Sequence, residues 1–289
     1  MSTPRLLALA ALLVLALLLG AVLLVGHRLS RPAQRLIGAP PPAVQAEAIR
    51  LPTDVGGHVG GWFSAGRPGA GVVLLLHGVR GDRLAMLDRA LFLQHAGFST
   101  LLIDLPAHGD SSGQRITFGK HEGAGVRAAL AYLALRLPDE RVGVIAVSLG
   151  AAALVLESPQ LASAAVVLES MYPTIQEALA DRLALHLGTW SKALSPLLLS
   201  QLPWRTGVSA AELRPIERIG HLRSPLLLIA GAQDLHTTVA ETERLFAAAA
   251  EPKSLWIIPG AAHVDLHLSD RPAYEARVGG FLAHHLRQH

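Results

Sequence analysis

The hydrophobic positions of this chain fall into one long run and several short ones. Residues 6–25 are all Leu, Val, Ala or Gly, and a helix of this length, at about 1.5 Å per residue, matches the roughly 30 Å hydrocarbon core of a bilayer. A secretory signal usually has a shorter apolar region, of about 7 to 15 residues, followed directly by a small-residue cleavage site. The nearest such site ends at Ala46. We therefore expect residues 1–31 to form a single transmembrane anchor; the alternative is a cleaved signal, which would leave a secreted or periplasmic protein.

The residues beside this anchor give a weak indication of its orientation. Arg5 precedes the apolar run, whereas Arg28, Arg31 and Arg35 follow it, and an excess of basic residues is typical of the cytoplasmic side. The count favours a cytoplasmic body, and the opposite topology stays open. Residues 32–44 are rich in Pro and Ala, which predicts an extended tether that holds the following domain off the membrane.

Residues 45–289 form the expected soluble body, in which short apolar runs alternate with helical patterns. The runs are typical of strands buried on both faces of a parallel sheet, and they cover residues 72–76, 99–103, 141–147, 164–168, 225–230 and 254–258. Elsewhere apolar residues recur every three or four positions, as at Leu84, Leu87 and Leu91, which predicts amphipathic helices. This order predicts an α/β fold with a mostly parallel central sheet flanked by helices, whose ligands bind beyond the carboxyl ends of the strands.

One stretch, at about 171–223, breaks the alternation because it lacks a strand pattern and places Leu and Trp among Pro and Gly. We expect a helical insertion at the edge of the sheet. Whether this insertion caps a binding site or only adds packing stays open.

Composition and charge exclude several classes of function. Hydrophobic residues make up 51% of the chain and charged residues 16%, which excludes disorder as its main state. Cysteine is absent, so disulfide scaffolds, thiolate zinc sites and thiol nucleophiles are excluded. The 25 basic residues against 22 acidic ones form no dense basic run, and we expect no nucleic-acid partner. The oligomeric state stays open.

Ser148 has the most informative surroundings in the chain. It directly follows the strand expected at 141–147 and precedes a helix of small residues. A nucleophile on such a strand–turn–helix elbow needs small residues two positions to either side, because the backbone packs closely there. Ala146 and Gly150 occupy these positions. Glycine is usual at both, so Ala146 is a mild departure.

A serine hydroxyl needs a base to become nucleophilic, and the base needs a carboxylate to orient it. Asp234 follows the strand expected at 225–230, and His263 follows the one at 254–258. Both therefore lie in loops at the carboxyl ends of strands. The chain order Ser148, Asp234, His263 is that of one known class of catalytic triad.

With these features the chain resembles the α/β-hydrolases over nearly all of residues 45–289. The segment 77–81 (His-Gly-Val-Arg-Gly) resembles the oxyanion loop of that family, and the segment 104–111 (Asp-Leu-Pro-Ala-His-Gly-Asp-Ser) resembles its Asp-x-x-x-His-Gly-x-Ser motif. The overall character is similar to small bacterial serine esterases and to the serine aminopeptidase branch.

The resemblance implies a carboxylesterase-like hydrolase that acts through an acyl-enzyme. Ser148 would attack the ester carbonyl, His263 would take its proton, and Asp234 would orient the imidazole. The backbone N–H groups of Val79 and Leu149 would stabilise the oxyanion. The substrate would be a small-molecule ester, and neither a metal nor a cofactor is required.

Other functions share these residues. Peptidase, thioesterase and acyltransferase activities stay open, because each can use the same fold and triad. A non-catalytic membrane-tethered binding module is a further alternative, although we would then expect one triad position to be degraded, and none is.

Several further residues have more than one possible role. Glu169 also ends an expected strand and is an alternative acid to Asp234. Arg80 and Trp190 are candidates for substrate contact, Arg80 because it lies beside the oxyanion loop. His77 and His108 lie in glycine loops and are expected to have structural roles.

We expect His236 and His267 at the surface. His263 and His267 are four residues apart, but Val264 stands where zinc hydrolases have a glutamate, so we expect no metal site.

Overall fold

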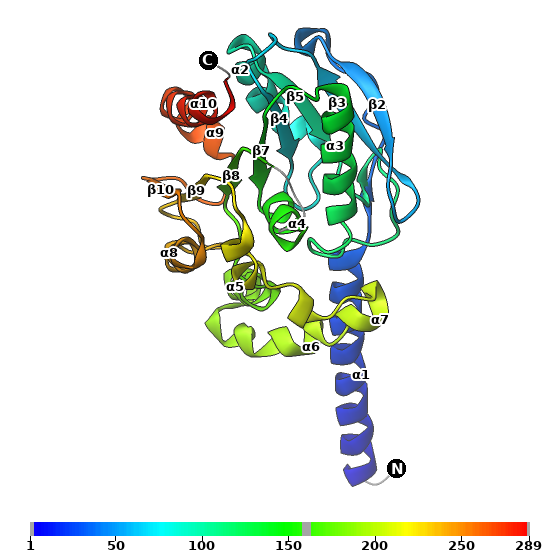
Figure 1. The fold of residues 1–289 in the computed structure, drawn as a ribbon. Helices are drawn as coiled ribbons and strands as arrows, with labels where there is room; N and C mark the ends of the chain where they lie inside the picture. The colour runs from blue at the N-terminus through cyan, green and yellow to red at the C-terminus, as the bar shows by residue number, and fades with distance from the viewer. Residues whose placement is uncertain (1–2, 158–162, 288–289) are drawn as a thin grey trace.

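The computed structural model describes residues 3–157 and 163–287, and within them a central sheet of eight strands separates two layers of helices (Figure 1). The strand order is β10-β9-β8-β7-β4-β5-β3-β2, and every neighbouring pair is parallel except the two that involve β3. The strands are β2 (Glu47–Pro52), β3 (His58–Ser64), β4 (Val72–Leu76), β5 (Ser99–Ile103), β7 (Val142–Val147), β8 (Ala165–Glu169), β9 (Leu226–Gly231) and β10 (Lys253–Ile258). The predicted α/β architecture with a mostly parallel sheet is confirmed.

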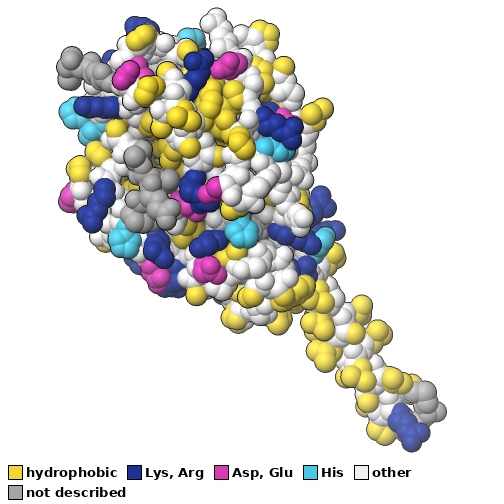
Figure 2. Space-filling model, turned by 45° about the vertical axis from the view of Figure 1, so that its right-hand side comes forward, with side chains coloured by type: hydrophobic (Ala, Val, Ile, Leu, Met, Phe, Trp, Pro, Cys, Tyr) yellow, Lys and Arg dark blue, Asp and Glu magenta, His cyan; other side chains and the backbone are white. Residues whose placement is uncertain are grey.

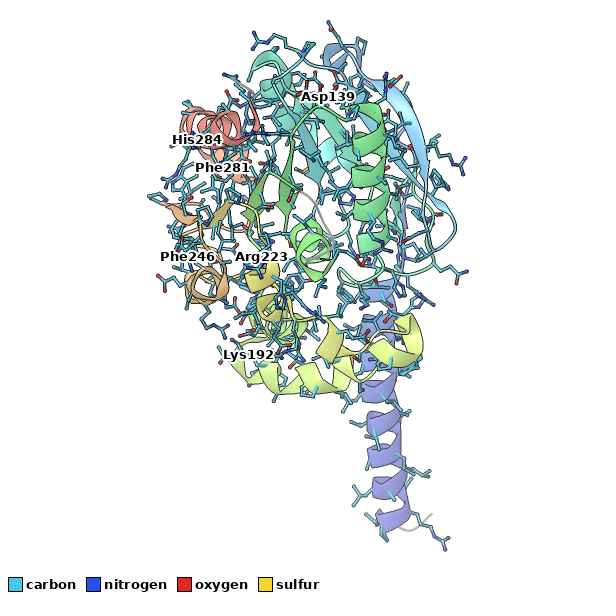
Figure 3. The ribbon with its side chains drawn as sticks, viewed as in Figure 1. Asp139, Lys192, Arg223, Phe246, Phe281 and His284 are labelled. Carbon is cyan, nitrogen blue, oxygen red and sulfur yellow. The ribbon has the colours of Figure 1, made fainter. Side chains whose placement is uncertain are left out.

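Hydrophobic side chains on the two faces of the sheet form two separate cores. The helices α3 (Gly123–Arg136), α4 (Leu149–Glu157) and α8 (Val239–Ala248) cover one face, and α2 (Leu87–His95) and α10 (Arg271–Leu286) cover the other. Figure 3 labels Phe246 on α8 and Phe281 on α10, which pack against different cores. Because the central strands are buried on both faces, they consist almost entirely of apolar residues.

The hairpin of β2 and β3 was not predicted from the pattern of apolar runs. Two glycines, Gly60 and Gly61, interrupt β3. A Cβ atom at Gly61 would lie 2.7 Å from the carbonyl oxygen of Leu102 on β5, so the close pairing of the two strands requires glycine at this position. The glycine that this tertiary contact requires also interrupts the run of hydrophobic residues by which a strand is predicted.

The insertion between β8 and β9 is helical and lies at one end of the sheet (Figure 1). It contains α5 (Ile175–Leu187), α6 (Ser195–Leu199) and α7 (Leu202–Thr206), joined by short 3-10 turns. Thr174 caps the start of α5 by accepting a hydrogen bond from the Glu177 N–H. We call this insertion the cap. Residues 158–162 lie outside the described part of the chain.

The N-terminal helix α1 (Thr3–Ser30) projects away from the body, and Figure 2 shows hydrophobic side chains along its projecting part. Its length and composition are sufficient to cross a membrane. Its last turns lie beside α6 and α7 of the cap. The helix is therefore exposed as far as Ala21 and contacts the cap only in its last turns.

The segment after α1 differs from the extended tether that its composition predicts. The short strand β1 (Ala33–Gln34) pairs with β6 (His108–Gly109), and the Ala33 N–H donates to the Ala107 carbonyl at 2.8 Å. The Ile37 N–H donates to Asp110 Oδ1 at 2.9 Å. These backbone contacts hold the segment against the body, so α1 is joined to the body by an ordered connection. Composition does not reveal such contacts.

Candidate functional site

Ser148 lies on a sharp turn between β7 and α4, with a backbone φ of 49°. Such a positive φ is strained for a residue with a side chain. The neighbours make the turn possible, because a Cβ atom at Gly150 would lie 2.8 Å from the carbonyl oxygen of His77. Ala146 is fully buried between Leu76 and Leu168 on the adjacent strands, where its methyl group is accommodated. Ser148 is 9% exposed and lines a cavity.

Asp234 and His263 meet at the same end of the sheet. The Nδ1 atom of His263 lies 2.8 Å from Asp234 Oδ2, and the aspartate side chain is fully buried. Asp234 also accepts hydrogen bonds from the backbone N–H groups of His236 and Thr237, at 2.8 and 2.9 Å, and from the Thr237 hydroxyl at 2.7 Å. The carboxylate is thus held in place by donors on three sides.

These contacts define the ionisation of Asp234. Burial alone would raise the pKa of its carboxyl, but the hydrogen bond and the attraction from His263, together with the donors of Thr237, lower the pKa below its ordinary value. An ionised carboxylate can only accept, so His263 Nδ1 carries a proton, and Nε2 of the neutral ring is free to accept another. His263 and Ser148 line the same cavity.

Two unengaged backbone N–H groups lie close to Ser148, one in the loop after β4 and one at the start of α4. Val79 belongs to this loop and Leu149 is the first residue of α4; both line the cavity. No acceptor for either N–H is found within residues 3–157 and 163–287. The first N–H groups of a helix lack partners within the helix, and Leu149 is such a residue.

His77 holds this loop in shape. Its Nε2 accepts from the Leu105 N–H at 3.0 Å, so the proton lies on Nδ1, which donates to the Gly78 carbonyl at 2.7 Å. Burial and the nearby His108 lower the pKa of His77 to about 3, so this ring is neutral. The N–H of Val79 points opposite to the Gly78 carbonyl across their planar trans peptide. His77 thus has the expected structural role, and through Gly78 it orients Val79.

Glu169, the alternative acid, is engaged elsewhere. Arg89 donates to both of its carboxylate oxygens, from Nε at 3.1 Å and from Nη2 at 2.6 Å, and the Tyr274 hydroxyl donates to Oε1. Arg89 also pairs with Asp265 at 2.8 Å, two residues after His263. Glu169 is therefore part of a buried ion network behind the loop that carries His263, and Asp234 is the carboxylate that contacts the imidazole.

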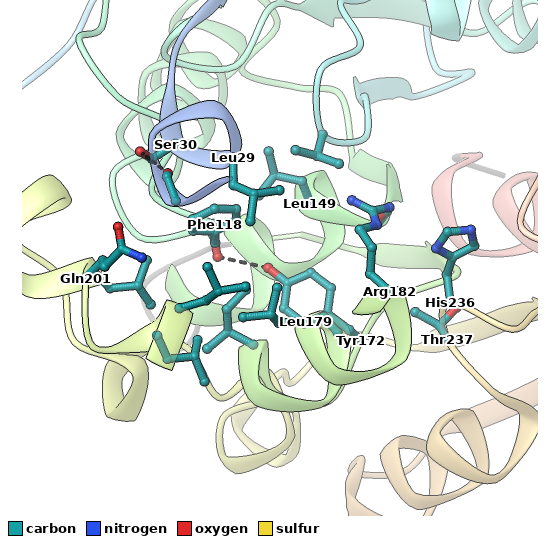
Figure 4. Close-up of a pocket in the computed structure, with 18 of the residues that line it drawn as sticks. Leu29, Ser30, Phe118, Leu149, Tyr172, Leu179, Arg182, Gln201, His236 and Thr237 are labelled. Atoms are coloured by element: carbon teal, nitrogen blue, oxygen red, sulfur yellow. Dashed lines mark hydrogen bonds between the residues drawn. The ribbon is translucent and has the colours of Figure 1, made fainter. Parts of the chain in front are cut away.

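The cavity beside Ser148 lies between the carboxyl edge of the sheet and the cap, and residues of both line it. Figure 4 shows side chains of the cap and of α1 around it. Trp190 is 68% exposed and is not one of the lining residues. Arg80 is exposed beside the lining residue Val79. The lining residues that the sequence did not indicate include Leu29, Tyr172, Arg182 and Thr237.

Of two histidines expected at the surface, His236 is half-buried and His267 is fully buried. His236 lines the cavity, and its ring centroid is 4.8 Å from that of His263. His267 is 1% exposed and stacks on Phe92. His236 lies two residues after Asp234 in the same loop, and this spacing could have predicted that His236 lies near the cavity. In the part of the chain that the structure describes, no three potential metal ligands gather into one group.

Comparisons with known proteins agree with this geometry. The model of the alpha/beta hydrolase family matches residues 73–277. An uncharacterized protein of Mycobacterium tuberculosis is 34% identical over 226 residues, which cover 77% of this chain and 74% of the relative. The YqkD protein of Bacillus subtilis, also uncharacterized, is 25% identical over 83% of this chain and 80% of its own. Among solved structures, the Pyrococcus furiosus esterase Pf2001 superposes with a TM-score of 0.74 at 22% identity, covering 89% of this chain and 98% of that one.

Proposed function

This chain belongs to the α/β-hydrolase family, and we propose that it is a serine esterase that cleaves carboxylic esters through an acyl-enzyme. The observation that carries the proposal is the shared cavity of Ser148 and His263, with the His263 ring held by Asp234 at 2.8 Å. In a hydrolase of this family, a serine that shares a cavity with a histidine of defined tautomer can act as the nucleophile in acyl transfer to water.

The first half of the reaction forms the acyl-enzyme. His263 Nε2 takes the hydroxyl proton of Ser148 as Oγ bonds to the ester carbonyl carbon. The carbonyl oxygen becomes an oxyanion, which accepts hydrogen bonds from the N–H groups of Val79 and Leu149; each such donor contributes about 2.7 to 4 kcal/mol to transition-state stabilisation. The bond to the alcohol oxygen then breaks, and that oxygen takes the proton from His263. Asp234 stabilises the transient imidazolium.

The second half releases the acid. His263 takes a proton from water, the water oxygen bonds to the acyl carbon, and the same two N–H groups hold the new oxyanion. The bond to Ser148 Oγ breaks, and Oγ regains a proton from His263. The net reaction consumes one water and yields a carboxylic acid and an alcohol.

The N-terminal helix places this chemistry at a membrane in our proposal. The leucines that α1 exposes are more stable in the hydrocarbon core of a bilayer than in water. We therefore propose that α1 is a retained single-pass anchor. Extraction of membranes with alkaline carbonate tests it: an uncleaved protein that stays in the pellet supports the anchor, and full release of the uncleaved protein contradicts it.

The esterase proposal is tested with p-nitrophenyl butyrate and a fluorophosphonate probe. Ser148→Ala should abolish probe labelling and lower kcat at least about a thousandfold. The matched control is Ser269→Ala, which removes an exposed hydroxyl and should retain both. Undiminished turnover by Ser148→Ala would remove the mechanism. Product analysis with added alcohols separates hydrolysis from acyl transfer.

A further inference from the structure

The membrane-type helix forms part of the wall of the cavity that contains Ser148. Gly26, Leu29 and Ser30, all in the last two turns of α1, line this cavity together with Ser148 and His263 (Figure 4). An anchor that only attached a domain to a membrane would not need to reach the site. Here the site is incomplete without α1.

Specific polar contacts hold α1 in this position. Gln201 of the cap donates from Nε2 to the Val22 carbonyl at 3.0 Å, and Arg205 donates from Nη2 to the Leu23 carbonyl at 2.7 Å. Gly26 leaves room for this approach, because a Cβ atom there would lie 2.3 Å from Gln201 Oε1. The contact between α1 and the cap is therefore built into both partners.

The inner part of the cavity is lined by hydrocarbon. Most of its lining side chains are apolar and come from α1, the cap, the elbow and two loops of the body: Leu29, Val79, Phe118, Leu149, Ile175, Ala178, Leu179, Leu198, Leu199 and Leu202. Tyr172 turns its hydroxyl away, toward the Phe118 carbonyl at 2.9 Å. An apolar space beside a nucleophile binds an apolar substituent of the substrate, which in an ester is the acyl chain or an alkyl alcohol.

Uncompensated positive charge lies at the rim of this apolar space. Arg182 lines the cavity and directs its guanidinium between Leu149 and His236 (Figure 4). Arg80 follows the lining residue Val79 and donates to the carbonyl of Arg28 at the end of α1. Burial lowers the pKa of Arg80, and repulsion from Arg31 and Arg182 lowers it further. Within residues 3–157 and 163–287, no carboxylate forms an ion pair with Arg31, Arg80 or Arg182.

Arg31 and Arg182 each repel Arg80, and none of the three has a carboxylate partner in the described part of the chain, so the group can receive an anion. Guanidinium groups bind phosphate oxygens well. The surroundings indicate where such an anion comes from. Next to α1, the cap exposes Leu197 and Trp204, and tryptophan is typical of the membrane–water interface. The cavity, which residues of α1, α6 and α7 line, thus lies beside a helix and a surface that both fit a bilayer.

We infer that the substrate is an acyl ester of a membrane lipid with a phosphate-bearing headgroup. Its acyl chain lies between α1 and the cap, its scissile carbonyl at Ser148, and its phosphate at the group of Arg31, Arg80 and Arg182. This inference rests on the proposed esterase function and names the substrate class for that site.

The headgroup part is tested with full-length protein in micelles of a neutral detergent. Two substrates share a palmitoyl chain: 1-palmitoyl lysophosphatidylglycerol carries a phosphate, and monopalmitoylglycerol carries none. We expect a higher kcat/KM for the first. Arg182→Gln should lower kcat/KM for the phosphate substrate about tenfold more than for the neutral one, because the lost contact is charge-assisted. Arg50→Gln, an exposed arginine on β2, is the matched control and should leave the ratio unchanged.

The acyl-chain part is tested at Leu29. Leu29→Trp should lower kcat/KM for palmitoyl esters more than for p-nitrophenyl butyrate, because the larger side chain shortens the apolar space. Leu135→Trp, on the exposed face of α3, is the control. A thermal unfolding temperature close to that of the wild type shows that each variant is folded.

The outcomes separate the two proposals. If no ester is hydrolysed in a Ser148-dependent manner, the esterase function fails. If butyrate is hydrolysed through Ser148 but the phosphate brings no preference, or Arg182→Gln lowers both palmitoyl substrates equally, the lipid inference alone is overturned. Preference for a soluble phosphate ester with a short acyl chain over the palmitoyl lipid would overturn it as well.

Discussion

The imidazole of His263 and the carboxylate of Asp234, which follow different strands, meet at 2.8 Å between Nδ1 and Oδ2. The carboxyl ends of β9 and β10 are adjacent in the sheet, so the two loops necessarily start side by side. The donors of Thr237 then fix the carboxylate. The order of the strands therefore determines which acid contacts His263, because β9 neighbours β10 whereas β8, which ends at Glu169, does not.

The first prediction separates Asp234 from Glu169. Asp234→Asn should lower kcat for p-nitrophenyl butyrate about ten-thousandfold, because an amide facing Nδ1 favours the wrong imidazole tautomer. Glu169→Gln should weaken the buried contact to Arg89 and lower the unfolding temperature, with a much smaller effect on kcat. Turnover and thermal unfolding are measured on both proteins. The opposite ranking of kcat would reassign the acid to Glu169.

The second prediction concerns His77 as a positioning residue. His77→Leu keeps the bulk but leaves the Leu105 N–H and the Gly78 carbonyl without this partner, so we expect a loss of about 1–3 kcal/mol in stability. Misplacement of the Val79 N–H should lower kcat by up to about a hundredfold, with a smaller change in KM. His77→Gln, which can both donate and accept, should recover part of the rate.

Burial and His108 lower the pKa of His77 from 6.5 to about 3. The ring is therefore neutral between about pH 5 and 8, where an ordinary histidine would titrate. The ratio of the variant rate to the wild-type rate should then be constant over this range. A ratio that changed with pH would show that His77 takes part through its charge, against its assignment as a structural group.

The third prediction addresses the ion network behind the site. Arg89→Met removes the cation and leaves Glu169 buried without its partner, which should cost about 3–5 kcal/mol in unfolding free energy. The double variant Arg89→Met/Glu169→Leu should recover much of this loss, because the fully buried carboxylate is gone and the remaining partner of Arg89, Asp265, is partly exposed to water. Denaturant unfolding measures all of these proteins. A double variant as unstable as the single one would show that packing around Arg89, and not charge, supports the loop of His263.

The fourth prediction follows from Glu241, in the first turn of α8 near two acidic residues of the cap. Burial, with repulsion from Asp181 and Glu177, raises the pKa of Glu241 from 4.5 to about 7. Between these two values the folded protein holds a proton that the unfolded chain has lost, so this group makes stability fall as pH rises from about 4.5 to about 7. Below that window its contribution is fully present, and above it the contribution is gone.

Glu241→Gln keeps a side chain able to accept from the Thr238 N–H but cannot ionise. Relative to wild type, it should therefore be more stabilising at pH 8 than at pH 5. Urea unfolding at both values tests the sign. An equal difference at the two pH values would mean that Glu241 titrates near its ordinary pKa in the folded protein.

Local patterns along the chain were enough to predict the sheet and its reactive edge. The six parallel strands could be predicted because strands buried on both faces must be apolar throughout. Ser148, Asp234 and His263 could be predicted as candidates because Ser148 directly follows such a strand and the other two lie in the loops after such strands. Parallel strands present their carboxyl ends at one edge. The β2–β3 hairpin was not predicted, since the contacts of Gly61 removed the pattern that would mark a strand.

The tertiary structure alone decided what surrounds that edge. The contact of Gln201 with the carbonyl of Val22 joins residues 179 positions apart, and no local periodicity reports such a pairing. The docking of residues 33–34, the place of His236 in the cavity and the gathering of Arg80 and Arg182 are of the same kind. Hydrophobic periodicity records which side of an element is buried, whereas a binding site depends on which distant elements bury one another.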